Sequence, residues 1–162
     1  MKIGVISDTH IHARDSQLPQ KITEEFKKVD MVIHAGDLVS LDVIDKLRSL
    51  CKNVIAVRGN MDADEVRNIL PEKQIISAGK YKIGVMHGYG APANLIEALK
   101  SAFKQDTVDI IIFGHSHKPL NEKIGEVLFF NPGSAMDKIF AEYNSYGIIE
   151  LNDKIEAKVM KL

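Results

Sequence analysis

The sequence contains little cysteine, no long hydrophobic run and no excess of either charge, and each absence excludes a class of protein. Its single cysteine, Cys51, excludes an internal disulfide framework and favours a reducing compartment. No apolar stretch approaches the roughly 20 residues that a membrane-spanning helix needs. The 21 basic and 22 acidic residues give a net charge of −1, so binding of nucleic acid through bulk positive charge is not indicated.

Length and composition predict one globular domain over residues 1–162. The chain is long enough for a hydrophobic core, and its 45% hydrophobic and 27% charged residues are ordinary for a globular protein. It shows no internal repeat, low-complexity tract or linker. The first aliphatic segment begins at residue 2 and leaves no room for a signal peptide, so we expect a cytoplasmic protein.

The first half of the chain alternates short aliphatic segments with segments of helical periodicity. The aliphatic segments predict strands at residues 2–7, 30–35 and 53–57. The periodic segments predict helices at residues 17–28, 40–50 and 63–70, with Ser40 as the N-cap of the second helix.

The second half is predicted to be mostly antiparallel strand. Residues 73–77 and 80–86 flank Ala78-Gly79 as a hairpin, and residues 93–103 have helical spacing. Residues 108–113 predict a strand buried on both faces. Further strands are expected at residues 121–124, 127–131, 145–151 and 154–160. The prediction is an α/β or mixed α+β fold with two sheets packed together and helices outside.

Side chains of the kinds that bind metal ions follow five of the aliphatic segments. The candidate ligands are Asp8, His10, Asp37, Asn60, His87, His115 and His117. Because the carboxyl ends of parallel strands meet at one edge of a sheet, we expect these groups to lie together. Carboxylate, amide and imidazole groups suit ions such as Mn²⁺, and seven ligands exceed the four of a structural zinc site. The sequence therefore predicts a centre with two ions.

These motifs, in this order and spacing, resemble those of the calcineurin-like metallophosphoesterases, in their small bacterial and archaeal phosphodiesterase branch. The matching segments are Asp8-Thr9-His10, Gly36-Asp37, Gly59-Asn60-Met61-Asp62, His87-Gly88, Gly114-His115-Ser116-His117 and Asn131-Pro132-Gly133-Ser134. The resemblance implies the metallophosphoesterase fold, a two-sheet β-sandwich flanked by helices.

The resemblance also implies a role for each candidate ligand. One ion would be held by Asp8, His10 and His117, the other by Asn60, His87 and His115, with Asp37 as the bridge. The expected ions are two Mn²⁺, with Fe, Ni, Co or Zn as alternatives. The residues expected to act in catalysis are Asp37, Asn60, His87 and His117. A hydroxide activated by both ions would attack phosphorus in line.

Met61 departs from the motif of the family. The family usually has histidine at this position, which is thought to protonate the leaving group, and a methionine side chain cannot donate a proton. General acid catalysis commonly contributes about 10²–10⁴-fold. We therefore predict weak activity on esters with poor leaving groups and better activity on activated phosphodiesters.

The sequence does not assign a single role to several residues near the motifs. Asp62 is expected to contact a ligand or close a turn rather than bind metal, and Arg58 could bind substrate phosphate or form a surface ion pair. His12 and His34 are not assigned to the metals. The apolar residues Met136, Ile139, Phe140 and Tyr143 could form a substrate lid, a subunit contact or buried packing.

The predicted function is a metal-dependent phosphoesterase that acts on small phosphodiesters. One alternative is a non-catalytic protein-interaction scaffold of the same fold, as in a retromer subunit, which the complete set of seven candidate ligands disfavours. Another is a phosphomonoesterase or nucleotidase. No membrane partner is expected, and association into a homo-oligomer is left open.

Overall fold

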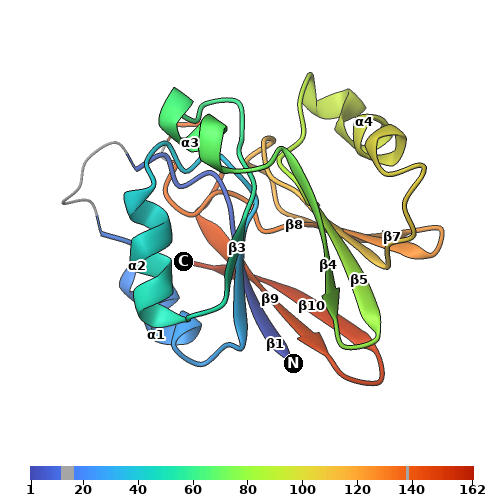
Figure 1. Ribbon diagram of the computed structural model, residues 1–162, viewed down its shortest axis with the longest axis horizontal. Coiled ribbons are helices and arrows are strands. Elements are labelled where there is room, and N and C mark those ends of the chain that lie inside the picture. The colour runs from blue at the N-terminus through green and yellow to red at the C-terminus, as the bar shows by residue number, and fades with distance from the viewer. Residues whose placement is uncertain (12–16, 138) are drawn as a thin grey trace.

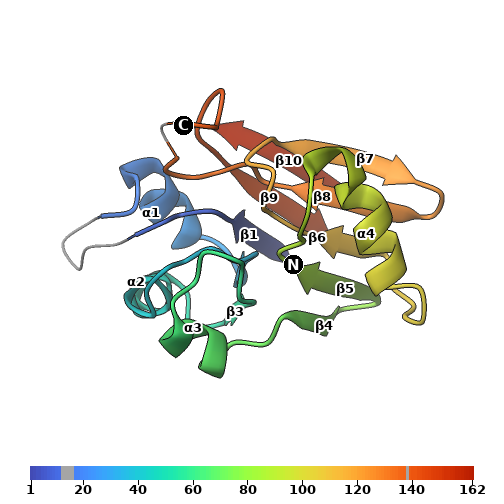
Figure 2. The same ribbon diagram turned by 90° about the horizontal axis from the view of Figure 1, so that it is seen from above.

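The computed structural model describes residues 1–11, 17–137 and 139–162. In it, two mixed five-stranded sheets pack face to face, and helices cover their outer faces (Figures 1 and 2). The prediction of a two-sheet β-sandwich flanked by helices is confirmed. In the part of the chain that the structure describes, no helix has the length and apolar character needed to cross a membrane.

The first sheet combines both ends of the chain and has the strand order β10-β9-β1-β2-β3. Its strands are β1 (Lys2–Ile6), β2 (Met31–His34), β3 (Val54–Ala56), β9 (Ser145–Leu151) and β10 (Ile155–Lys161). Strands β1, β2 and β3 run parallel, and β9 pairs antiparallel with both β1 and β10. The parallel strands are connected by helices α1 (Gln20–Phe26) and α2 (Asp42–Leu50).

The second sheet has the strand order β4-β5-β6-β8-β7. Its strands are β4 (Lys73–Ala78), β5 (Tyr81–Met86), β6 (Ile110–Ile112), β7 (Leu120–Ile124) and β8 (Val127–Asn131). The prediction of mostly antiparallel strands was wrong for its centre, because β5, β6 and β8 are parallel. The 3₁₀ turn η1 (Pro92–Asn94) and helix α4 (Leu95–Ala102) provide the long crossover that parallel strands require.

The predicted helices exist but are shorter than expected. Helix α1 begins at Gln20, because Pro19 occupies its N-cap, and helix α3 covers Asp64–Ile69 between β3 and β4. Helix α2 begins at Asp42 rather than at Ser40. The Ser40 hydroxyl still accepts a hydrogen bond of 3.3 Å from the Asp42 amide.

The hydrophobic core forms three layers that fix the positions of the strand ends. Between the sheets lie side chains such as Val5, Ile33, Val85 and Ile112. Helices α1 and α2 pack on the first sheet, and α4 packs on the second (Figure 1). Strand β6 is buried along its whole length, as predicted. The loops that follow β1, β2, β3, β5 and β6 therefore start from rigid points.

Candidate metal centre

The structure brings the seven candidate ligands together from five loops. Asp8 and His10 follow β1, Asp37 follows β2, Asn60 follows β3, His87 follows β5, and His115 and His117 follow β6. Three of these strands belong to the first sheet and two belong to the second. The centre is therefore built across the edge where the two sheets meet.

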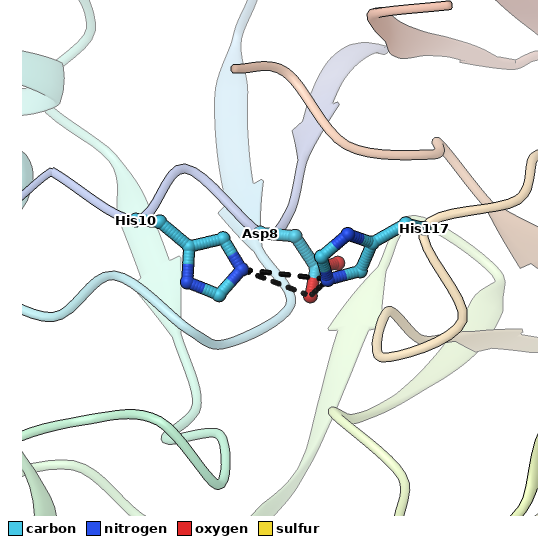
Figure 3. A group of neighbouring side chains, drawn as sticks. All are labelled: Asp8, His10 and His117. Atoms are coloured by element: carbon cyan, nitrogen blue, oxygen red, sulfur yellow. Dashed lines mark hydrogen bonds and ion pairs between the residues drawn. The ribbon is translucent and has the colours of Figure 1, made fainter. Parts of the chain in front are cut away.

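Asp8, His10 and His117 form the first group of possible ligands (Figure 3). Oδ1 of Asp8 lies 3.2 Å from Nε2 of His117 and 4.0 Å from Nε2 of His10. The two histidine Nε2 atoms are 3.4 Å apart. Three donor atoms thus converge on one small volume.

Asp8, Asp37 and His87 form the second group. Nε2 of His87 lies 3.3 Å from Oδ2 of Asp37 and 3.8 Å from Oδ1 of Asp8. Oδ2 of Asp37 is also 4.0 Å from Nε2 of His10 in the first group. Asp8 and Asp37 therefore both lie between the groups, whereas the sequence pointed to Asp37 alone as the bridge.

Asn60 and His115 lie beside the second group. Nδ1 of His115 is 2.9 Å from Oδ1 of Asn60, and the His115 ring lies 5.4 Å from the ring of His87. Nε2 of His115 is 2.8 Å from the carbonyl oxygen of Gly90, which can only accept, so Nε2 carries the hydrogen. In the neutral ring the lone pair of Nδ1 then faces another acceptor, Oδ1 of Asn60. A cation between them would satisfy both.

Buried His87 and partly buried His117 show the same mismatch in their neutral forms. Nδ1 of His87 donates to the carbonyl of Ala35 at 2.8 Å, and Nδ1 of His117 donates to Oδ2 of Asp137. Their Nε2 atoms consequently face the carboxylates of Asp8 and Asp37. Oδ1 of Asp8 and Nε2 of His87 are buried and have no hydrogen-bond partner among the residues that the structure describes. Orphaned acceptors that converge from carboxylates and imidazoles fit a divalent cation.

The pKa shifts in the centre also show that its carboxylates favour positive charge beside them. The contact with Asp8, aided by Asp137 and opposed by burial, raises the pKa of His117 to about 9. Burial alone would lower the pKa of His87 and raise that of Asp37, but their mutual contact moves both the opposite way. Without metal, His117 therefore carries a proton at neutral pH, and metal binding there must displace it.

Each carboxylate is held by one oxygen and leaves the other free. Oδ2 of Asp8 accepts hydrogen bonds from the Ser7 hydroxyl at 2.6 Å and the His115 amide at 3.2 Å. Oδ1 of Asp37 accepts a hydrogen bond of 2.7 Å from the Met61 amide. The remaining oxygens, Oδ1 of Asp8 and Oδ2 of Asp37, are the ones that face the histidines.

The backbone of the ligand loops is strained in a consistent way. Five of the candidate ligands have positive φ angles, namely Asp8, His10, Asp37, His115 and His117. Left-handed conformations cost of the order of 1–2 kcal/mol for residues other than glycine and cluster at functional sites. Gly59 allows a related close approach, because a Cβ atom there would lie 2.1 Å from Oδ1 of Asp37.

The residues that the sequence analysis considered beside the candidate ligands have defined contacts. Asp62 closes two loops, since its carboxylate accepts the amides of Val39 and Gly59, both at 2.6 Å. Arg58 pairs with Glu72 at 2.9 Å. His34 is fully buried in β2 and belongs to neither group of possible ligands; its Nε2 lies 3.1 Å from the Thr9 hydroxyl. The sequence prediction for His12 lies outside the described residues.

Two residues that support the centre were not among the candidate ligands named from the sequence. Asp137 contacts Nδ1 of His117, and the Ser134 hydroxyl donates to the carbonyl of Asp8 at 2.7 Å. Ser134 belongs to the turn motif after β8 that was expected near the centre. Asp137 had no signal beyond its place near that motif, because it follows no strand directly.

A cleft of about 680 Å³ opens over the first group. Its walls include His10, Met61, His117, Met136, Ile139 and Phe140. A separate cleft of about 200 Å³ lies on the other side of Asn60 and includes Arg58 and Arg67. The candidate ligands are thus accessible to a small molecule.

Comparison with known proteins identifies the class. The family model described as the calcineurin-like phosphoesterase superfamily domain matches residues 1–154. The chain belongs to this superfamily, so its expected class, a metal-dependent phosphoric ester hydrolase, is confirmed at the level of the family.

Three individual proteins are similar to this chain in sequence or structure. The chain is 38% identical to a Methanocaldococcus jannaschii protein named as a probable metallophosphoesterase, MJ0623, over all of this chain and 82% of the relative. It is similar in structure to a novel archaeal phosphodiesterase, with 29% identity, a TM-score of 0.80 and full coverage of both chains. Wild-type Vps29 of Entamoeba histolytica, in complex with Zn²⁺, has 29% identity and a TM-score of 0.77, with 99% of each chain covered.

Proposed function

We propose that the protein is a phosphodiesterase with two divalent ions, bound by the two groups of ligands and by Asn60 and His115. The observation that carries this proposal is the convergence of orphaned acceptors, above all Oδ1 of Asp8 and Nε2 of His87. The similarity to an archaeal phosphodiesterase over the full chain supports the choice of substrate class. Mn²⁺ remains the expected ion, and the Zn²⁺ complex of Vps29 supports zinc as an alternative.

The residues of the chain would have two tasks, which are to bind the ions and to keep the donor atoms in place. Bound ions would supply positive charge for the phosphoryl oxygens and an activated water for in-line attack. Asp8, Asp37 and His87 are each hydrogen-bonded to the backbone of a neighbouring loop, which fixes their donor atoms before substrate arrives. Such preorganisation avoids a cost of reorganisation during the reaction.

The experiment is metal analysis combined with hydrolysis of bis(p-nitrophenyl) phosphate, before and after chelation and after re-addition of Mn²⁺ or Zn²⁺. Asp37→Asn should abolish hydrolysis and lower the occupancy of both ions, with a circular dichroism spectrum like that of the parent. An Asp37→Asn protein with full activity would contradict the proposal. A parent protein that binds no ion would favour the non-catalytic scaffold instead.

Substrate choice is measured in the same assay. A phosphomonoesterase or nucleotidase would hydrolyse p-nitrophenyl phosphate or a nucleotide faster than the diester. A cytoplasmic location, a small phosphodiester as the natural substrate and association into a homo-oligomer stay predictions.

A further inference from the structure

The cleft above the first group has an apolar wall that the ligands do not explain. Ile139 is 82% exposed, Phe140 73% and Met61 58%, and all three line this cleft together with Met136. Large apolar side chains with this exposure are costly to leave in water unless they meet a partner. They lie within the same cleft as His10 and His117.

The wall is held at a fixed place relative to the metal ligands. The carboxylate of Asp137 accepts the amides of Phe140 and Ala141, both at 3.0 Å, and also contacts His117. The Phe140 ring lies edge-to-face against the His117 ring, with centroids 6.0 Å apart. Phe140 is therefore tied to the metal centre, while Met136 also packs against the hydrophobic core.

The described residues that line the cleft include no lysine or arginine that could pair with an anionic group of a ligand, and Asp137 adds a negative charge. The nearest arginines, Arg58 and Arg67, line the separate smaller cleft. An apolar organic group in the larger cleft would bury the exposed side chains of Met61, Ile139 and Phe140.

We propose that Met61, Met136, Ile139 and Phe140 form a binding site for an apolar, preferably aromatic, ester group of the substrate. This inference rests on the proposed function, because the phosphoryl group must lie at the metal centre for its substituent to reach this wall. It names the substrate class as phosphodiesters with at least one apolar arm, rather than polyanionic diesters.

The first test measures binding without turnover. Phenylphosphonate, ethylphosphonate and 2-sulfoethylphosphonate present the same phosphoryl group with an aromatic, a small and an anionic arm. Calorimetry on metal-loaded protein should show phenylphosphonate binding about tenfold tighter than the other two, a ratio typical of apolar pockets. Phe140→Ser and Ile139→Ser should reduce this preference, whereas Ile69→Ser, a change at a 62% exposed residue in α3, should retain it.

The second test separates binding from chemistry. With bis(p-nitrophenyl) phosphate, Phe140→Ser should raise KM about tenfold and leave kcat within about twofold, because the lost contact is uniform in ground and transition states. Metal-dependent hydrolysis with an unchanged KM and unchanged phosphonate ratios would overturn the inference and leave the phosphodiesterase proposal intact. Absence of any hydrolysis would overturn the phosphodiesterase proposal, and the phosphonate series would still decide the binding site.

The same variants also test whether the apolar wall is instead a contact between subunits. If the parent protein dimerises in sedimentation experiments, Phe140→Ser and Ile139→Ser are both monomeric, and the phosphonate preference is unchanged, the apolar wall is an interface between copies. That result would overturn the inference. A parent protein whose oligomeric state is the same in all variants supports it.

Discussion

Met61 shows how a single side chain limits the chemistry of the centre. Its amide supports Asp37 at 2.7 Å, while its 58% exposed side chain faces the cleft without a proton to give. The backbone at this position therefore supports a metal ligand, while the side chain faces the substrate cleft.

Met61→His should raise the turnover of an alkyl phosphodiester by about tenfold or more, because an imidazole can protonate a poor leaving group. Turnover of bis(p-nitrophenyl) phosphate should change little, since p-nitrophenolate leaves without a proton. Met61→Leu is the matched control. Steady-state kinetics on both esters provide the measurement, and an unchanged alkyl-ester rate would contradict the role assigned to position 61.

Asp137 acts through His117 rather than on substrate. Asp137→Asn should weaken the binding of the ion nearest His117 by about 10–100-fold, the usual effect of removing a partner that orients a ligand. Titration with Mn²⁺ monitored by calorimetry measures this, and Asp153→Asn at the exposed β9–β10 turn is the control. Equal affinities in the two variants would show that His117 needs no such support.

At the level of elements, the loops after the strands carry the function and also the strain. Helices and strands followed from local periodicity, and the candidate ligands were found because each follows an aliphatic run. The parallel arrangement of β5, β6 and β8 was missed, because local pattern does not record which strand lies beside which. Asp137 was missed because it follows no strand directly, so no local pattern marks it.

Gly59→Ala tests the close packing of two such loops. A Cβ atom at position 59 would lie 2.1 Å from Oδ1 of Asp37, so the carboxylate must move and metal occupancy should fall at least about tenfold. Gly79→Ala is the control, because its Cβ atom would meet nothing within 4 Å, although its φ of +63° makes alanine unfavourable. Both variants should lose stability in thermal melts, but only Gly59→Ala should lose metal; normal occupancy there would contradict this packing argument.

At the level of the whole molecule, His34 makes stability depend on pH. Burial lowers its pKa to about 3, and Nδ1 accepts the Gly36 amide while Nε2 donates to Thr9. The unfolded chain, with a histidine pKa of about 6.5, therefore binds a proton that the folded chain does not. The contribution of His34 is complete above pH of about 6.5 and is lost as the pH falls towards 3.

Urea denaturation in the presence of a chelator measures this dependence. Between pH of about 6 and 4 the free energy of unfolding should fall by up to about 1.4 kcal/mol per pH unit more in the parent than in His34→Gln. Parallel curves for the two proteins would show that His34 is not the titrating group.

The hydrocarbon layer between the sheets also acts as a spacer. Val5 and Ile33 belong to strands that lead to Asp8 and Asp37, and Val85 and Ile112 to strands that lead to His87 and His115. A close-packed interior resists compression, so the thickness of this layer sets the gap between donors from opposite sheets. We therefore expect side chains that contact no ion to influence the preference of the centre among ions of different radius.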